Sequence, residues 1–241
     1  MRLDRYLANA GFGSRTEVKE MIRQGLVRID GQVCRDAGQS VSEDGSSSIS
    51  LNELPILLKK QIHLMMNKPA GLITAMDDPR HRTIAELIPP RFKSAGLFPV
   101  GRLDIDATGL LLLTNDGTLC HRLASPRWEV WKTYAVTIQG KVFEQSDILQ
   151  FEAGLELADG LKCRPAQLTV QEPQKALLTI HEGKFHQVKR MMLATGRRVT
   201  SLRRIRIGPL LLDQKLAPGE CRELTAAEAA ELYHLVELAT D

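Results

Sequence analysis

The chain is poor in aromatic residues, has few cysteines and lacks any long apolar run. Phe, Trp and Tyr make up 5% of its 241 residues, so few side chains are available to stack on bases. No run approaches the roughly 20 apolar residues that a membrane-spanning helix needs, and the charged start predicts no signal peptide. The four cysteines are scattered, which argues against a disulfide framework or a zinc site. We therefore expect a soluble, cytoplasmic protein without a bound metal.

The net charge of +3 is small, but the charges are unevenly distributed. From Lys184 to Arg206 there are eight Lys or Arg residues and no acid. From Met1 to Arg35 there are seven bases and four acids, whereas the stretch from Asp213 to Asp241 carries seven acids and two bases. Unpaired like charges repel each other, so a solvated helix face is a poor explanation for the first run. Two basic regions far apart in the chain favour a long polyanion held at two places.

The first 60 residues have the pattern of a small separate unit. Apolar residues at helical spacing end at Gly11, and Ser14 with Glu17 three residues on predicts a capping box at the start of a second helix. Residues 26–34 read as a hairpin whose turn is Asp30-Gly31. A Ser-rich acidic stretch follows, and we place a domain boundary near residue 60. This unit gathers six basic residues: Arg2, Arg5, Arg15, Lys19, Arg23 and Arg28.

Residues 61–241 predict a second domain of the α+β class with a mixed sheet. Strand-like runs occur at 62–67, 110–114, 133–138, 166–170, 177–181 and 200–207. Helical patterns occur at 83–88, 117–123, 186–195 and 226–238. The two kinds of element do not alternate regularly and some strands are adjacent, which disfavours a doubly wound parallel sheet.

Three segments of this domain carry candidate chemistry. Gly101-Arg102-Leu103-Asp104-Ile105-Asp106-Ala107-Thr108-Gly109 precedes four consecutive leucines, which suit a strand buried on both faces. By itself this is an acidic loop at the mouth of a core strand, and such loops are usually turns. Glu182 to Met192 reads as a tight turn into a helix that keeps His186, Lys189 and Arg190 away from the core. Lys132 and Tyr134 share one face of a strand, and Lys68-Pro69-Ala70-Gly71 reads as a plain turn.

Taken together, these segments resemble the pseudouridine synthases, specifically the RsuA-like branch that modifies bacterial ribosomal RNA. The resemblance covers nearly the whole chain. Residues 1–60 resemble the RNA-binding module of a small-subunit ribosomal protein, and residues 61–241 resemble the synthase domain, whose sheet is mixed and largely antiparallel. The stretch from Gly101 to Asp116 is the most specific match. The family often has a hydroxyl residue where this chain has Ala107, a departure that we expect to tune the loop and not to abolish activity.

The resemblance implies a role for each matching residue. Asp104 is the implied catalytic carboxylate, Tyr134 stacks on the target uracil, Lys189 is the basic partner of Asp104, and Arg102 holds the opened stem. Lys184, Arg190 and the six basic residues of the first unit would contact RNA phosphates. The uridine must leave its stack to react. Isomerisation to pseudouridine loses no atoms and involves no redox step, so no cofactor is expected. The sequence does not decide whether Asp104 acts as nucleophile or base.

The implied partner is ribosomal RNA. The stretch from Asp77 to Thr83 resembles the small-subunit members of the family more than the large-subunit ones, which implies small-subunit RNA in an assembling particle. We expect a monomer that does not bind a membrane. Two alternatives remain open at this stage. Asp104 and Asp106, with Asp116 nearby, could hold magnesium in an RNA hydrolase. The basic regions could instead belong to a non-catalytic ribosome-assembly factor.

Overall fold

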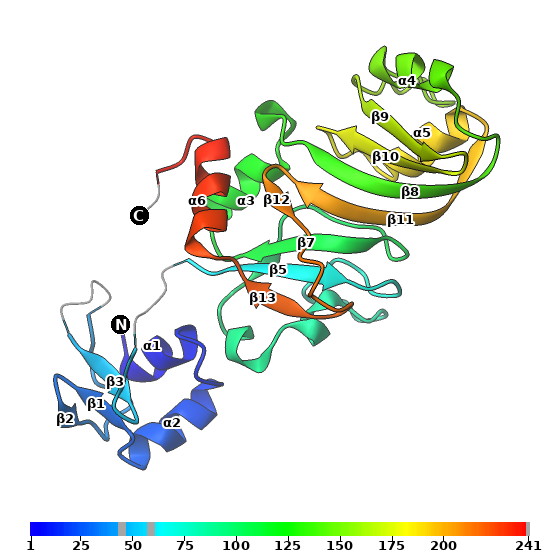
Figure 1. The fold of residues 1–241 in the computed structure, drawn as a ribbon. Coiled ribbons are helices and arrows are strands. Elements are labelled where there is room, and N and C mark those ends of the chain that lie inside the picture. Colours follow the sequence, from blue (N-terminus) through cyan, green and yellow to red (C-terminus); the bar gives the residue numbers. More distant parts are fainter. Residues whose placement is uncertain (43–46, 57–60, 240–241) are drawn as a thin grey trace. The chain divides into compact units, whose positions relative to one another are not determined.

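The computed structural model describes residues 1–42, 47–56 and 61–239. The chain divides into two units, one of Met1–Ile62 with Leu87–Phe98 and one of His63–Glu86 with Pro99–Asp241 (Figure 1). Residues 57–60, where the sequence places the domain boundary, lie outside the described residues, as does the acidic stretch 43–46. Each unit is described by itself.

The first unit packs two short helices on a four-stranded sheet. Its elements are α1 (Leu3–Asn9), α2 (Arg15–Arg23), β1 (Val27–Ile29), β2 (Gln32–Val33), β3 (Ile49–Leu51), β4 (Leu54–Ile56) and a 3-10 turn η2 (Pro90–Phe92). The strands are ordered β2-β1-β3-β4. Ser14 and Glu17 form the predicted reciprocal capping box of α2. Asp30 and Gly31 both have positive φ, as the predicted two-residue hairpin turn requires. Leu3, Leu7 and Ile22 are at most 1% exposed and centre its core.

The second unit is built on a nine-stranded mixed sheet. Its strands are β5 (His63–Lys68), β6 (Phe98–Pro99), β7 (Thr108–Thr114), β8 (Lys132–Gly140), β9 (Gln167–Glu172), β10 (Lys175–Ile180), β11 (Arg197–Ile207), β12 (Leu210–Leu211) and β13 (Cys221–Glu223). The order is β13-β5-β7-β11-β8-β10-β9, with β12 on β11 and β6 on β7. Of the described pairings that join these strands, β7 with β11 is parallel and the others assigned a direction are antiparallel. The predicted α+β class with a mixed, largely antiparallel sheet is confirmed.

Helices cover parts of this sheet and join its strands. They are α3 (Gly117–Ala124), α4 (Gln145–Glu152), α5 (Gln187–Ala194) and α6 (Ala226–Leu235), with 3-10 turns η1 (Ile84–Leu87) and η3 (Pro126–Trp128). In Figure 1 the long strands β8 and β11 curve together beneath α4 and α5. The four leucines 110–113 of β7 are completely buried, as their sequence predicts for a strand covered on both faces. β7 therefore anchors the loop that precedes it to the centre of the unit.

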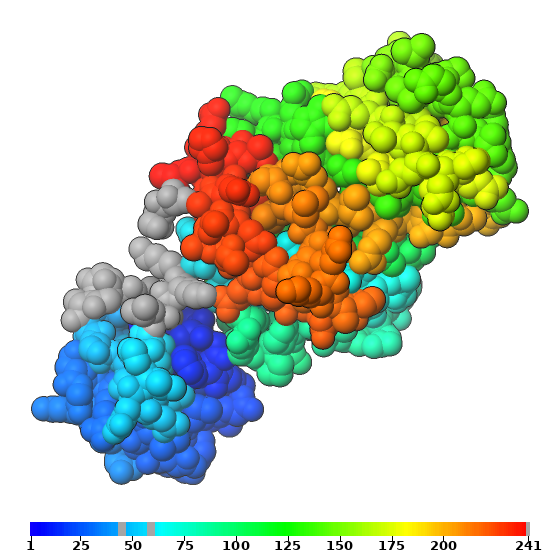
Figure 2. Space-filling view, viewed as in Figure 1, coloured from blue at the N-terminus to red at the C-terminus, as the bar shows by residue number. Residues whose placement is uncertain are grey.

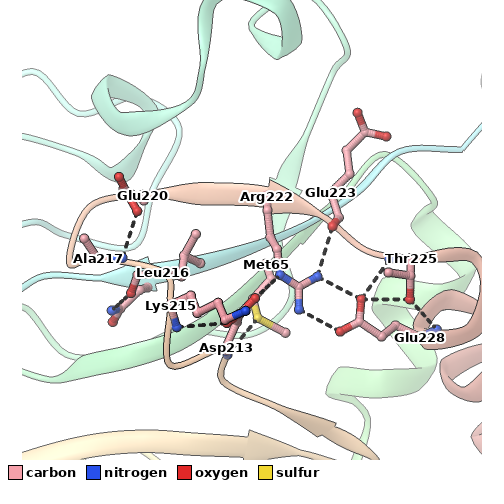
Figure 3. A network of polar contacts seen from close by, with 11 residues as sticks. Met65, Asp213, Lys215, Leu216, Ala217, Glu220, Arg222, Glu223, Thr225 and Glu228 are labelled. Carbon is pink, nitrogen blue, oxygen red and sulfur yellow. Dashed lines mark hydrogen bonds and ion pairs between the residues drawn. The ribbon is translucent and has the colours of Figure 1, made fainter.

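The C-terminal part of the chain returns to the edge of this sheet. β13, which the sequence did not predict, pairs with β5 antiparallel. The Arg222 guanidinium joins this segment together, because it donates to Asp213 at 2.7 Å and to both carboxylate oxygens of Glu228 at 2.7 and 2.8 Å (Figure 3). Figure 2 shows the C-terminal segment, coloured orange to red, spread over the face of the unit turned to the viewer. The acidic C-terminal stretch is thus folded onto the sheet edge through an arginine that neutralises two of its acids.

Candidate active site

Asp104 lies in a loop whose backbone is held in place by contacts with neighbouring parts of the chain. The loop enters β7, the strand between β5 and β11. Gly109 has φ +98°, and a Cβ added to it would meet the carbonyl oxygen of Arg204 on β11 at 2.2 Å. Only glycine lets β11 approach so closely here. The close packing of β7 and β11 at the base of the Asp104 loop therefore explains why the motif has a glycine at position 109.

Lys68 fixes the same loop from the other side. Its side chain is completely buried, and Nζ donates to four backbone carbonyls, those of Pro69, Asp104, Ile105 and Ala107, at 2.9–3.3 Å. Burial lowers the pKa of Lys68 to about 8. The predicted turn is present at Ala70 and Gly71, but Lys68 is the last residue of β5 and its ammonium holds the Asp104 loop, a role that the turn prediction missed.

A threonine adds a second attachment for the loop. Thr74 Oγ1 donates to the carbonyl of Leu103 at 2.8 Å and accepts from its N–H at 3.1 Å. The N–H of Ala107 closes a turn onto the Asp104 carbonyl at 3.1 Å. Ala107, where the family often has a hydroxyl, is itself buried. The backbone on both sides of Asp104 is thus held, and the Asp104 side chain, which is 24% exposed, extends from this fixed backbone.

Two basic side chains contact the carboxylate of Asp104, and one of them also contacts Asp106. Lys189 Nζ lies 3.1 Å from Asp104 Oδ2 and 2.6 Å from Asp106 Oδ1, and His186 Nε2 lies 3.5 Å from Asp104 Oδ1. The hydrogen bond from Lys189 lowers the pKa of Asp106. Burial disfavours the charged form of Lys189, but its hydrogen bonds to Asp106 and Asp104 outweigh this and raise its pKa. Lys189 is therefore a cation shared between two carboxylates.

The turn before α5 brings Lys189 to the loop. Val188, Met191 and Met192 of α5 are buried in the domain, so Lys189 points away from the core, as the sequence predicts. His186, the residue before α5, has φ +47°, a conformation that is unusual for a residue with a side chain. Its ring stacks on Phe185, with centroids 3.9 Å apart. Phe185 is 77% exposed and was not singled out from the sequence.

A cavity of about 480 Å³ opens beside Asp104, within the size range of small-molecule sites. Tyr134, Arg102 and Phe185 line it together with Asp104. Lys132 and Arg204 also contribute to its wall, and Tyr134 lies directly opposite Arg204 in the register of β8 and β11. The structure thus brings together Asp104, Tyr134 and Arg102 around one cavity, with Lys189 in contact with the carboxylate.

The predicted RNA-contacting residues have different surroundings. In the first unit Arg5 and Arg15 are exposed. Arg2 and Lys19 are paired with Asp4 at 3.2 and 3.9 Å, and Arg23 with Glu20. Arg28 donates to the Gly31 carbonyl at 3.1 Å. In the second unit Lys184 lies 3.2 Å from Glu182, and Arg190 lies 2.5 Å from Asp159.

The prediction that the charges of the run from Lys184 to Arg206 are unpaired was wrong for part of the run. Acids from other parts of the chain neutralise Lys184, Lys189 and Arg190, as described above. Arg197 is 1% exposed and pairs with buried Asp147 at 2.5 Å, so it is a core residue and not a surface cation. The run fails as a guide because residues distant in sequence supply the counter-charges.

Asp116 occupies a structural position. Its carboxylate accepts hydrogen bonds from the N–H groups of Thr118 and Leu119 at the start of α3, and from the Tyr233 hydroxyl at 2.6 Å. It follows β7, whereas Asp104 and Asp106 precede this strand. The three aspartates of the magnesium alternative therefore lie at opposite ends of β7 and cannot form one site, and the ammonium of Lys189 already bridges two of them.

Comparisons with known proteins show which family the chain resembles. The model of the RNA pseudouridylate synthases matches residues 62–194, and the S4 domain model matches residues 1–45. The chain belongs to the RNA pseudouridylate synthase family. The predicted resemblance, to this family with an N-terminal ribosomal-protein-like module, is confirmed.

Relatives within this family match the chain from end to end. It is 43% identical to "Uncharacterized RNA pseudouridine synthase YtzG" of Bacillus subtilis, over 95% of this chain and 96% of that protein. It is 40% identical to "Ribosomal small subunit pseudouridine synthase A" of Escherichia coli, over 96% of this chain and 100% of that protein. A solved pseudouridylate synthase, 34% identical, superimposes with a TM-score of 0.68 over 96% of this chain and 99% of that one. None of the helices in the described residues is long and apolar enough to cross a bilayer.

Proposed function

We propose that this pseudouridine synthase isomerises one specific uridine of ribosomal RNA, with Asp104 as its catalytic carboxylate. The observation that carries the proposal is the position of Asp104. Its backbone is held by Lys68 and Thr74, its carboxylate contacts Lys189 at 3.1 Å, and it opens into the cavity lined by Tyr134. A rigidly held carboxylate beside a cavity of nucleoside size is what chemistry at a single ribose requires.

The reaction exchanges one bond of the ribose for another. The bond from ribose C1′ to uracil N1 breaks, the base turns, and C1′ bonds to C5, which loses its proton to solvent while N1 gains one. Asp104 acts at the sugar, as nucleophile at C1′ or as base, and Lys189 holds a positive charge 3.1 Å from its carboxylate. Tyr134, 7% exposed in the cavity wall, stacks on the uracil. The atoms balance within the substrate, so the residues need no cofactor for this step.

The target uridine reaches the cavity by leaving its stack, which costs a few kcal/mol. Arg102 is exposed at the cavity lining and would support the opened stem. Stacking of the flipped base on Tyr134 returns about 1–3 kcal/mol. The flipping cost and the stacking gain are therefore of similar size, and binding of the surrounding RNA decides which uridine is presented.

The RNA is, on this proposal, small-subunit ribosomal RNA in an assembling particle. The end-to-end relative of Escherichia coli carries this substrate in its name, and the S4 match supports a second RNA-binding surface in the first unit. Exposed Arg5 and Arg15 would contact phosphates from the first unit. We propose that the protein acts as a monomer in the cytoplasm, reaching the target with both units.

Mapping of pseudouridines in ribosomal RNA tests this assignment. RNA from a strain that lacks this protein should lose one pseudouridine in small-subunit RNA, and expression of the wild-type chain should restore it. The Asp104→Asn variant, expressed at the same level, should not restore it. Loss of a site in large-subunit RNA would contradict the small-subunit assignment, and an unchanged map would contradict the function.

A further inference from the structure

Arg204 is a buried cation without a counter-charge in the wall of the cavity. It is 2% exposed, and its Nε donates to the Leu110 carbonyl at 2.8 Å. Its Nη2 is buried and has no hydrogen-bond partner among the described residues. No acid of the described chain lies within ion-pair distance of it, in contrast to Arg197 of the same strand, which pairs with Asp147. An unpaired buried charge costs several kcal/mol. A ligand in the cavity that pairs with the Arg204 guanidinium would offset this cost.

The neighbours of Arg204 make this wall more positive. Tyr134 lies opposite Arg204 across β8 and β11, and Lys132, two residues before Tyr134, lies on the same face of β8. Lys132 lines the cavity, with Nζ donating to the Val130 carbonyl at 2.9 Å. Burial, with the charge of Arg204, lowers the pKa of Lys132 to about 8. Asp104 is the one carboxylate that the described residues contribute to the lining. The face that carries the stacking tyrosine therefore also offers two cations.

We propose that Arg204, assisted by Lys132, binds the carbonyl oxygens of the flipped uracil and stabilises the negative charge that the base acquires during the reaction. The inference rests on the proposed function. When the C1′–N1 bond breaks, its electron pair stays on the uracil and the charge spreads to O2 and O4. This holds whether Asp104 attacks C1′ or removes a proton from the sugar. Donors aimed at the place where charge develops, in a site that excludes water, are the strongest kind of electrostatic catalysis.

A guanidinium suits this position better than an acid or a neutral amide. It stays protonated at any working pH, so it donates hydrogen bonds to the departing base without transferring a proton to it. It also selects the base, because cytosine presents an amino donor where uracil presents O4, and two donors facing each other in a buried site are strongly disfavoured. Arg204 would therefore contribute to the rate and to the choice of uridine over cytidine.

Single-turnover rates of Arg204 variants on target RNA test the first part. Arg204→Gln should slow isomerisation by about 10²–10³-fold, the effect of removing one donor at a developing oxyanion, with RNA affinity within threefold of wild type. Arg204→Lys should isomerise uridine at least tenfold faster than Arg204→Gln. The matched control is Arg197→Gln, a buried arginine of the same strand that lies outside the cavity lining. It should lower the melting temperature but leave the rate of the folded fraction within twofold.

Substrates with single sulfur substitutions identify the atom that is bound. Target RNAs carry 2-thiouridine or 4-thiouridine at the reacting position, or a phosphorothioate beside it. The proposal predicts that one thiouridine changes the wild-type rate and that Arg204→Gln abolishes this difference, because interacting groups are not additive. If the phosphorothioate shows this coupling instead, Arg204 binds a phosphate and the assignment to the base is overturned.

The outcomes separate this inference from the proposed function. If wild-type protein does not isomerise uridine, the proposed function fails. If wild type is active and folded Arg204→Gln keeps a rate within threefold of it, only the role of Arg204 fails. Should Arg204→Gln not fold, Lys132→Met carries the same test, because Lys132 is only partly buried. A loss of at least tenfold at unchanged RNA affinity supports the cationic wall, and a rate within threefold of wild type overturns it.

Discussion

Lys189 Nζ lies 3.1 Å from Asp104 Oδ2, although the strands β7, β8, β9 and β10 all lie between the two residues in the sequence. The contact forms because buried Val188, Met191 and Met192 fix the rotation of α5, and because Lys68 fixes the Asp104 loop. Lys189 Nζ also lies 2.6 Å from Oδ1 of Asp106, whose side chain is 66% exposed. The ammonium therefore has one partner in the cavity and one at the surface.

Lys189→Met should slow single-turnover isomerisation by about 10²-fold or more. The acid limb of the pH–rate profile should move to higher pH, because the site loses the positive charge between its two carboxylates, including the hydrogen bond that lowers the pKa of Asp106. RNA affinity should stay within threefold. Lys175→Met, which changes an exposed lysine paired with Glu172, is the control and should match wild type. An unmoved acid limb combined with a collapse of RNA affinity would make Lys189 a phosphate contact instead.

Arg5→Ala with Arg15→Ala should weaken RNA binding without slowing the chemical step at saturating RNA. Both side chains are exposed in the first unit, and neither is among the residues that line the cavity of the second. Each lost phosphate contact should reduce the slope of log affinity against log salt by about 0.7–0.9. Titrations at several salt concentrations measure this. An unchanged slope would show that the first unit holds RNA through other residues.

Phe185→Ala should reduce the affinity for target RNA by about 1–3 kcal/mol, the value of one stacked base. Phe185 is 77% exposed at the cavity lining and stacked on His186, so it offers an open aromatic face next to Asp104. Phe185→Tyr should keep the affinity. Leu149→Ala, at a leucine of α4 that is 70% exposed, controls for loss of surface apolar area. Equal affinity of the Ala and Tyr variants would remove Phe185 from the RNA interface.

Glu228→Gln should destabilise the protein in a pH-dependent way. The hydrogen bond from Arg222 lowers the pKa of Glu228 to about 2, below its unfolded value of 4.5. The ion pair therefore stabilises the fold above about pH 4.5, and this contribution disappears as the pH falls towards 2. At pH 7 the variant should lose about 1–3 kcal/mol in free energy of unfolding. Urea unfolding at pH 7 and pH 3 measures both values, with Glu231→Gln on the same helix as control. The same loss at both pH values would contradict this account.

The sequence predicted the placement of residues that depends on local pattern. The face of α5 that carries Lys189 and the shared strand face of Lys132 and Tyr134 follow from helix and strand periodicity, whereas the Asp104 motif was identified by its resemblance to the family, because its spacing alone indicates only an acidic turn. Lys68 and Arg204 were not identified, because their roles come from contacts with chain segments 36 and 94 residues away. The sequence did carry a signal for Arg204. It lies two residues after Leu202, so both side chains are on the same, buried face of β11. A charged residue at such an inward position is a candidate ligand contact.

The most direct test of the central claim is tritium release from ribosomal RNA labelled at uridine C5, measured with Asp104→Asn and Asp106→Asn, each with and without EDTA. Asparagine keeps the shape of the side chain and removes its charge and basicity, so fold and RNA affinity should survive in both variants. The account predicts that Asp104→Asn releases tritium only at background, that Asp106→Asn keeps substantial activity, and that EDTA changes neither result. Tritium release by Asp104→Asn at the wild-type rate would contradict the assignment of Asp104 as the catalytic carboxylate.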